Sequence, residues 1–390
     1  MHELRKKSII VDGNIISLRN STITDPERKT MKEARRKDTG VELGRIFGCL
    51  IVIGCHTYLP IVIHDNYDMS RTLVAMFCSD GVAIFWLILG FFLFKTENYL
   101  KMLQRTVSRI VVPLLLVTAS HFYFNAWLSG SVETIAESLH KSANDYKSAL
   151  GALIRWTPID KESGYLWYLY VYVLVILACP AISGMVSYLD KNIKAKRLYS
   201  ILAVLMFVCN LISSNELMEF THHTVRGLFP AMMIAIIGHN VYMHKDYLVR
   251  YGLFAPILFL ILNLVRLKIF MAGFTTSIYW FTLIGILCAI CVLAFSFSLA
   301  SRINSERLEK CINVLGSYTF TIYLIHGFTK RILFRLMRKE MLAILSPLPS
   351  FAIDAAFPAI MSTIIFLVSL VAAIVIRKCY RVGAALINKS

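Results

Sequence analysis

The chain has 390 residues, of which 57% are hydrophobic and only 17% are charged. Ordinary globular domains average about 45–50% apolar and about 25% charged residues, and the mean hydropathy of +0.63 shifts this chain further from them. Lys and Arg outnumber Asp and Glu by 41 to 24, a formal net charge of +17. The composition excludes soluble, secreted, fibrous and disulfide-scaffold classes.

The apolar residues lie in long runs without charged side chains. A helix that crosses the hydrocarbon core needs roughly 20 apolar residues, and several runs reach that length. In chain order, the predicted spans are 43–63, 73–94, 109–128, 165–187, 198–214, 227–243, 250–266, 278–299, 311–328 and 356–376. We therefore predict an all-α polytopic membrane protein with about ten transmembrane helices and no large soluble domain.

Residues 1–40 are polar and of mixed charge, and no apolar run follows their first basic cluster as it would in a cleaved signal peptide. We expect a disordered cytoplasmic tail over 1–40, a transmembrane domain over 41–380 and a short cytoplasmic tail over 381–390.

Basic residues gather in the loops that this topology places inside. They are Lys95, Lys101, Arg105, Lys191, Lys194, Lys196, Arg197, Arg302, Arg307 and Lys310. The predicted outer loops 64–72 and 215–224 are acidic or nearly neutral. The positive-inside rule then places the N-terminus in the cytoplasm. Topology signals and anionic lipid headgroups explain the excess of basic residues better than nucleic acid does.

One predicted outer loop, 329–340, breaks this pattern. It carries the five cations Lys330, Arg331, Arg335, Arg338 and Lys339, and their spacing leaves an apolar face. Either an amphipathic helix lies there in the membrane interface, or one span has been miscounted.

Arg45 and His56 are the first candidates for chemistry. Eleven helical residues make three turns plus roughly 20°, so both side chains share one face about 16 Å apart. An ionisable group in the outer half of a span is a functional candidate. The alternative is a structural histidine bonded to a neighbouring helix, with Arg45 as a topology charge.

Three cations precede the third span at positions i, i+4 and i+8, namely Lys101, Arg105 and Arg109. A stripe of this kind on a helix suits a polyphosphate, although it also suits a plain cytoplasmic anchor. Asp80, inside the second span, is expected to pair with a cation in the bundle. Cys288 and Cys291 have the spacing of a metal or redox pair, but no second pair accompanies them, so we predict no metal site.

Five motifs, in order between about residues 40 and 380, resemble the integral-membrane acyltransferase-3 family. Arg45 and His56, with ten residues between them, resemble its first-helix signature, and Asp80–Phe92 resembles its V-x-x-F-F-x-x-S-G-F pattern. Arg105–Pro113 resembles its basic entry to the third helix. The last two are Leu166-Trp167-Tyr168-Leu169, like its L-W-Y/F-L box, and Tyr323-Leu-Ile-His326, like its Y-L-x-H box. Leu89 replaces the usual Ser and Trp86 the usual Phe, so no role carries over for a second-helix hydroxyl.

The resemblance implies that 41–380 is an acyltransferase domain that carries acetyl from acetyl-CoA to a sugar hydroxyl. The acceptor would be a bacterial surface polysaccharide, O-antigen or capsule, or its lipid-linked precursor, at the inner membrane. His56 would be the general base or a brief acyl carrier, with Arg45 beside it as a second catalytic residue. The CoA phosphates would lie near Arg45, Lys101, Arg105 and Arg109. The expected substrate-binding or structural residues are His326, Tyr323, Trp167 and Asp80.

A transporter or flippase for a glycolipid or an anionic solute is the main alternative, and a sensor or scaffold without turnover is a third. Transporters often show matched halves with broken helices, and the sequence shows neither. Acyl-CoA hydrolysis or acyl transfer by the purified protein would separate an enzyme from the other two.

Overall fold

The computed structural model describes residues 8–11, 14–17, 38–62, 69–94, 98–159, 163–195, 197–198, 223–272 and 283–387. The chain divides into two units, Met1–Asp38 and Thr39–Ser390. Nearly all of the predicted span 198–214, and most of the predicted outer loops 64–72 and 215–224, lie outside the described residues.

The first unit contains a short antiparallel hairpin. Strand β1 (Ser8–Val11) pairs with β2 (Asn14–Ser17), and Val11 lies opposite Asn14. The two residues between the strands are Asp and Gly, a pair that favours two-residue hairpin connections. The composition of the predicted tail did not indicate this element.

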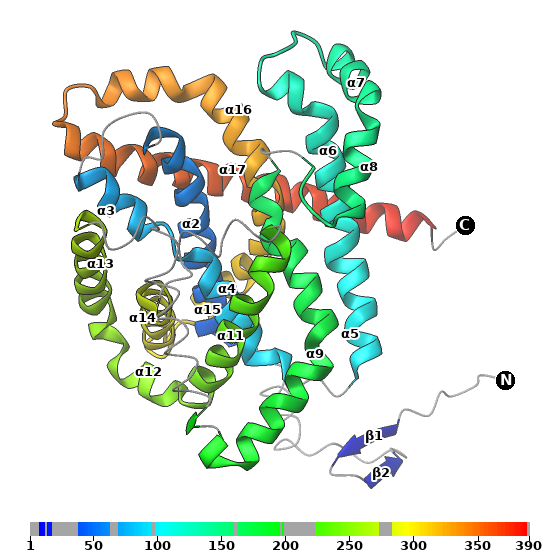
Figure 1. Cartoon of the computed structure of the whole chain (residues 1–390), viewed down its shortest axis with the longest axis vertical. Helices are drawn as coiled ribbons and strands as arrows, with labels where there is room; N and C mark the ends of the chain where they lie inside the picture. Colours follow the sequence, from blue (N-terminus) through cyan, green and yellow to red (C-terminus); the bar gives the residue numbers. More distant parts are fainter. Residues whose placement is uncertain are drawn as a thin grey trace. The chain divides into compact units, whose positions relative to one another are not determined.

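The described part of the second unit is built from helices (Figure 1). In chain order they are α2 (Thr39–Val62), α3 (Met69–Phe77), α4 (Gly81–Leu93), α5 (Tyr99–Thr106), a π-helical turn (Val107–Val111), α6 (Val112–Leu128), α7 (Ile135–Asn144), α8 (Tyr146–Ile154), a 3₁₀ turn (Gly164–Leu166), α9 (Trp167–Lys191), α11 (His223–Met243), α12 (Lys245–Tyr251), a 3₁₀ turn (Gly252–Phe254), α13 (Ala255–Met271), α14 (Leu283–Ala300), α15 (Glu306–Gly316), α16 (Thr319–Leu345) and α17 (Ser350–Ile387).

Seven helical segments of the described chain are long and apolar enough to cross a membrane, and they confirm the all-α polytopic class. They are Thr39–Thr57, Thr72–Leu93, Tyr99–Leu128, Gly164–Lys191, Lys245–Met271, Leu283–Ala300 and Phe351–Cys379. A shorter apolar helix covers Leu228–Met243. These segments match eight of the ten predicted spans in position.

The predicted span 311–328 is wrong as a single helix. Helix α15 ends at Gly316, and α16 begins at Thr319 after a tight turn in which the amides of Ser317 and Tyr318 donate to α15 carbonyls. Four of the first five residues of α15 are charged, so α15 is an amphipathic helix with an exposed polar face rather than half of a span.

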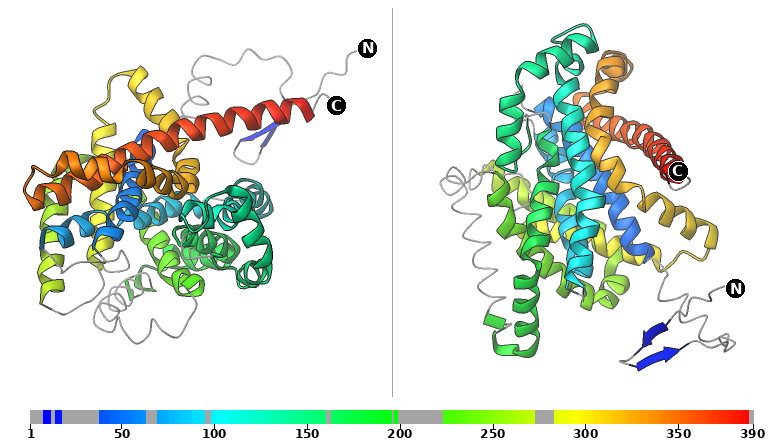
Figure 2. Two further views of the ribbon diagram at one scale, coloured as in Figure 1. Left: turned by 90° about the horizontal axis from the view of Figure 1, so that it is seen from above. Right: turned by 90° about the vertical axis from the view of Figure 1, so that its right-hand side faces the viewer.

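The cationic segment 329–340 is the second half of α16, and it is helical as expected. Its apolar residues are divided between a buried and an exposed face. Leu333 is buried and Phe334 packs beside it, whereas Ile332 and Leu336 are exposed. The buried face is turned toward α17, which is one long helix packed against α16 (Figure 2).

Helix α2 is the central element, since it packs against α4, α14, α15, α16 and α17. Helices α4 and α11 approach each other through glycines, because Gly90 abuts the carbonyl of Ala235 and Gly238 abuts the carbonyl of Leu87. Small residues at such crossings let backbones approach closely and are typical of helix pairs in membranes.

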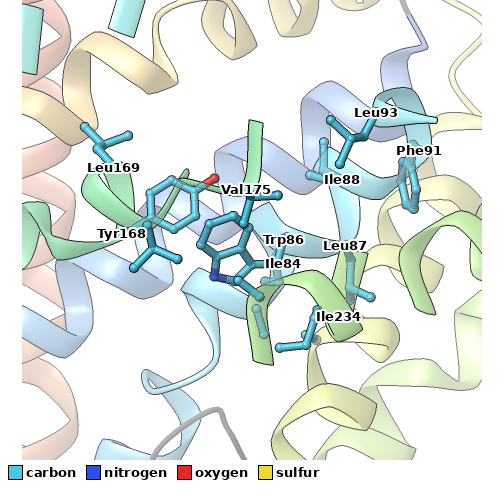
Figure 3. Close-up of a cluster of buried hydrophobic side chains, with 14 of the residues drawn as sticks. Ile84, Trp86, Leu87, Ile88, Phe91, Leu93, Tyr168, Leu169, Val175 and Ile234 are labelled. Atoms are coloured by element: carbon cyan, nitrogen blue, oxygen red, sulfur yellow. The ribbon is translucent and has the colours of Figure 1, made fainter. Parts of the chain in front are cut away.

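The largest hydrophobic cluster lies between α4, α9 and α11 (Figure 3). Trp86, Leu87 and Phe91 of α4 are fully buried; Trp86 meets Tyr168 of α9, and Phe91 stacks on Tyr242 of α11. This cluster holds the first part of α9 against α4, which fixes the position of the residues described next.

Candidate functional site

Two cavities lie along α9, at different heights. The first, which we call the histidine cavity, has a volume of about 250 Å³ and reaches Tyr165 and Trp167 where α9 begins. The second, which we call the basic cavity, has a volume of about 440 Å³ and reaches Tyr172. Trp167 and Tyr172 are five helical residues apart, about 7–8 Å along the helix axis.

The histidine cavity is formed by three helical segments that are distant in the sequence. Its lining residues are His56 from α2, Gly164, Tyr165 and Trp167 at the start of α9, and His326, Gly327, Lys330 and Arg331 from α16. The imidazole rings of His56 and His326 have centroids 5.4 Å apart. The fold therefore brings two predicted site histidines, from the first and a late helix, to one cavity.

Tyr165 organises the wall of this cavity. Its hydroxyl donates to the carbonyl of Leu324 at 2.7 Å, so its oxygen accepts from Nε2 of His121 at 2.8 Å. Its own backbone carbonyl accepts from the hydroxyl of Tyr323 at 2.6 Å. These bonds tie α6, α9 and α16 together.

The ring of His326 is fixed by a main-chain bond. Nδ1 lies 2.6 Å from the carbonyl of Tyr323 in the preceding turn. A carbonyl can only accept, so Nδ1 carries the proton and the lone pair of the neutral ring is on Nε2. Nε2 is buried and has no hydrogen-bond partner among the described residues.

Two cations from the next turn of α16 complete the histidine cavity. The Lys330 ammonium lies 3.4 Å from the backbone carbonyl of His56. The Arg331 guanidinium donates to the Asn125 side chain at 2.8 Å, and Arg335 donates to the carbonyl of Trp127. Arg331 and Arg335, whose place in a predicted outer loop did not fit the positive-inside rule, thus bind the end of α6.

The basic cavity contains the predicted cation stripe. Its lining residues are Asn98, Lys101, Met102, Arg105, Thr106, Arg109, Ile110 and Tyr172. The N-terminus of α5 is capped by Asn98, whose side chain accepts from the amide of Lys101. A π-helical turn, Val107–Val111, follows Arg105 and contains Arg109. All three predicted cations still line one cavity, although this turn alters the even spacing of an α-helix.

Arg45 is on the face of α2 expected for it, but it does not line either cavity. Its guanidinium pairs with Glu42 at 2.8 Å, one turn earlier. It lies close enough to Tyr172 of the basic cavity to interact with it electrostatically. The helix Thr39–Val62 is continuous, so the separation of about 16 Å between Arg45 and His56 holds.

Aromatic residues occupy the space between the two cavities. The ring of Trp86 lies 4.5 Å from Tyr168 and 6.4 Å from Tyr172, nearly parallel to the latter. Tyr168 in turn lies 5.7 Å from Tyr323. Trp86 replaces the Phe of the family pattern, and it extends this aromatic wall toward the basic cavity.

Asp80 belongs to neither cavity. It is buried at the turn before α4, where both of its oxygens accept from Nη1 of Arg266 at 3.2 and 3.1 Å and one accepts from Ser79. Arg266 is the cation with which it was expected to pair, and the pair joins α13 to α4. Its position indicates a structural role.

Sequence reasoning missed several residues of the histidine cavity and its wall, among them Tyr165, His121, Lys330 and Arg331. Lys330 lies four residues after His326, so helical spacing could have suggested it. Tyr165 directly precedes the Leu-Trp-Tyr-Leu box. Nothing in the local sequence of His121 indicated that it would bond to Tyr165.

The described residues contain no group of three or more His, Cys, Asp or Glu side chains arranged to hold a metal ion. Cys288 and Cys291 are buried thiols within α14.

Comparison with known families identifies the family of the chain. Residues 38–378 match the model of the acyltransferase-3 family, whose description is "Acyltransferase domain". The match covers most of the chain, which therefore belongs to that family and is a membrane acyltransferase. No curated protein and no solved structure matches the chain.

Proposed function

We propose that this protein transfers an acetyl group from acetyl-CoA to a sugar hydroxyl of a bacterial surface polysaccharide, O-antigen or capsule, or of its lipid-linked precursor. The observation that carries the proposal is the pair of cavities along α9, one lined by cations and one by histidines. An acyl-CoA needs a site for its phosphates at one end and a reactive site for its thioester at the other.

The basic cavity would hold the CoA phosphates. Lys101, Arg105 and Arg109 are exposed and line one cavity, and guanidinium groups can bind phosphate oxygens bidentately. Arg45 would act beside them, through Tyr172, rather than at the reacting atoms. The pantetheine arm would then have to pass the buried rings of Trp86 and Tyr168 to reach His56.

The histidine cavity would be the reaction site. Neutral imidazole can take a proton from the acceptor hydroxyl or attack the thioester itself. In either case the acyl carbon exchanges its bond to sulfur for a bond to the acceptor oxygen, and the hydroxyl proton ends on the CoA thiol. His56 is placed for either role because it faces His326 in the cavity.

The acceptor sugar would enter at the start of α9. Trp167 offers an apolar ring face there, and the polar groups of Lys330 and Arg331 lie on the same cavity wall. The polysaccharide class is what the motif resemblance implies, and these residues are compatible with a polar, hydroxyl-rich acceptor. The protein would be in the bacterial inner membrane with its N-terminus in the cytoplasm.

We expect His56→Ala to abolish transfer, because the reacting thioester would lose its nucleophile or base. Surface glycans from cells with wild-type protein should gain one acetyl group per repeat by mass spectrometry, and glycans from cells with the variant should not. Acetyl-CoA consumption by the purified protein in nanodiscs gives a second measurement.

His244→Ala is the matched control, since His244 is an exposed histidine outside both cavities. It should leave acetylation unchanged at equal abundance. Glycan acetylation by His56→Ala at the wild-type level would contradict the role of His56. Wild-type protein that consumes no acetyl-CoA, with glycans unchanged by its presence, would contradict the proposed function.

A further inference from the structure

The starting point is the orientation of His326. Its Nδ1–H is committed to the Tyr323 carbonyl, so its remaining lone pair, on Nε2, is buried without a partner among the described residues. An unpaired buried acceptor costs stability. A ring held so that its one basic atom is unpaired beside a cavity is suited to accept a proton from a bound molecule.

His121, in the same cluster, also has a buried ring nitrogen, Nδ1, without a hydrogen-bond partner among the described residues, but its place in the fold differs. Its Nε2–H donates to the Tyr165 hydroxyl, and its ring stacks on Phe328 with centroids 3.9 Å apart. It does not line the histidine cavity. His121 therefore supports Tyr165. His326 differs because its ring lines the histidine cavity.

The size of the cavity bears on how the two substrates use it. Pockets that enclose drug-sized ligands measure about 300–1,000 Å³, whereas the histidine cavity has about 250 Å³. The histidine cavity would hold the thioester end of acetyl-CoA and the acceptor sugar more readily one after the other than at the same time. If the two substrates bind one after the other, the acyl group must stay on the protein after CoA leaves and before the acceptor binds.

We propose that the two histidines divide the reaction, His56 carrying the acetyl group and His326 acting as general base toward the acceptor. This proposal rests on the proposed function and assigns the chemistry within its site. The ring centroids are 5.4 Å apart. An acyl carbon on a nitrogen of His56 can therefore lie close to a hydroxyl that is hydrogen-bonded to Nε2 of His326.

The two steps balance. In the first, a His56 nitrogen attacks the thioester carbonyl, the N–C bond forms and the C–S bond breaks. The proton from the other His56 nitrogen goes to the thiolate, which leaves as CoA. In the second, the acceptor hydroxyl gives its proton to Nε2 of His326 while its oxygen attacks the acyl carbon. The C–N bond then breaks, and the departing His56 imidazole takes the proton back from His326.

The test is a rapid-quench measurement of CoA release from acetyl-CoA by the full-length protein in nanodiscs. Without acceptor, wild-type protein should release one equivalent of CoA per protein in a burst. His326→Gln should keep the burst, because the first step does not use His326, and His56→Gln should lose it. With de-acetylated surface polysaccharide as the acceptor probe, His326→Gln should turn over about 10²–10⁴ times more slowly than wild type.

Added imidazole should restore turnover to His326→Gly, which a merely structural role of His326 would not allow. His326→Asn serves if the Gln variant does not accumulate, and His244→Gln is the control for the change of residue type. Three results would overturn the proposal. They are wild-type turnover without a burst, loss of the burst in both His326→Gln and His326→Asn, and normal turnover in either of these two variants. If wild-type protein transfers no acetyl group at all, the proposed function fails instead.

Discussion

Gly327 is the residue on which the geometry of the histidine cavity depends most directly. A Cβ at this position would collide with the ring of Tyr165. The absent side chain lets Tyr165 lie flat against α16, where its hydroxyl reaches Leu324 and its oxygen meets His121. A single methyl group would therefore move the residue that ties three helices together.

We expect Gly327→Ala to lower acyl transfer and to destabilise the protein by about 1–3 kcal/mol, the usual cost of overpacking a well-packed site. Thermal unfolding in detergent and acetyl-CoA consumption are the measurements. Gly184→Ala is the matched control, because Gly184 is a helical glycine of α9 at which an added Cβ would meet no described atom within 4 Å. Equal behaviour of the two variants would show that the Tyr165 contact does not shape the site.

The residue scale also shows what sequence reasoning can and cannot reach. The motifs located His56, His326 and Trp167, which do line one cavity. The partner of Asp80 is Arg266, 186 positions away, and local spacing contains no information on such a pair. The protonated nitrogen of His326 likewise depends on a carbonyl orientation that only the folded helix defines.

At the scale of elements, hydropathy predicted the long helices well because each of them must bury its backbone polar groups in lipid. It failed at 311–328, where the apolar run crosses a turn between an amphipathic helix and the start of α16. The charged residues of α15 precede that run. A window that begins at residue 311 therefore omits the evidence that α15 is not a span.

The segment from α5 to α6 combines a cation stripe with a π-helical turn. Such turns are rare and often occur at functional sites. Here the turn follows Arg105 and contains Arg109, and both residues line the basic cavity. If this cavity holds the CoA phosphates, its cations should affect the donor more than the acceptor.

We expect Arg105→Ala and Arg109→Ala each to raise the KM for acetyl-CoA roughly 2- to 10-fold, the loss of about 0.5–1.5 kcal/mol of hydrogen bonding at an exposed site. The kcat should change little if this binding is the same in the ground and transition states. Steady-state kinetics with varied acetyl-CoA measures both constants. Lys194→Ala, an exposed cation outside the basic cavity, is the control. An unchanged KM in both Arg variants would leave these residues as topology charges.

At the scale of the whole molecule, the two cavities along α9 lie at different heights and present different chemistry. The histidine cavity lies at the start of α9, near the end of α6 that Arg331 and Arg335 contact. Helix α9 then runs past the basic cavity and ends at Lys191. Three of the α16 cations, Lys330, Arg331 and Arg335, donate to acceptors of the protein, so these three need not act as inside-directing topology signals.

This arrangement makes transmembrane orientation part of the mechanism. If α9 begins near the outer surface and ends near the cytoplasm, the donor phosphates meet cations on the side where acetyl-CoA is made. The acceptor then meets the histidine cavity from the other side. The reverse orientation would place the basic cavity outside, where no acetyl-CoA is available, and would remove the basis of the proposed function.

Cysteine accessibility in intact cells tests the orientation. We expect a single cysteine at Ser131 to react with an impermeant thiol reagent added outside, and a cysteine at Lys194 to react only after the membrane is opened. Both positions are exposed and outside the two cavities, and they follow α6 and α9, which run in opposite directions across the membrane in the predicted topology. The native cysteines must first be replaced, since Cys311 and Cys379 are exposed. Gly44, in the first turns of α2, is less suitable than Lys194 as the cysteine position expected on the cytoplasmic side, because a Cβ at Gly44 would press on Leu293. Labelling of Lys194→Cys from outside, with Ser131→Cys protected, would invert the topology and contradict a donor site in the cytoplasm.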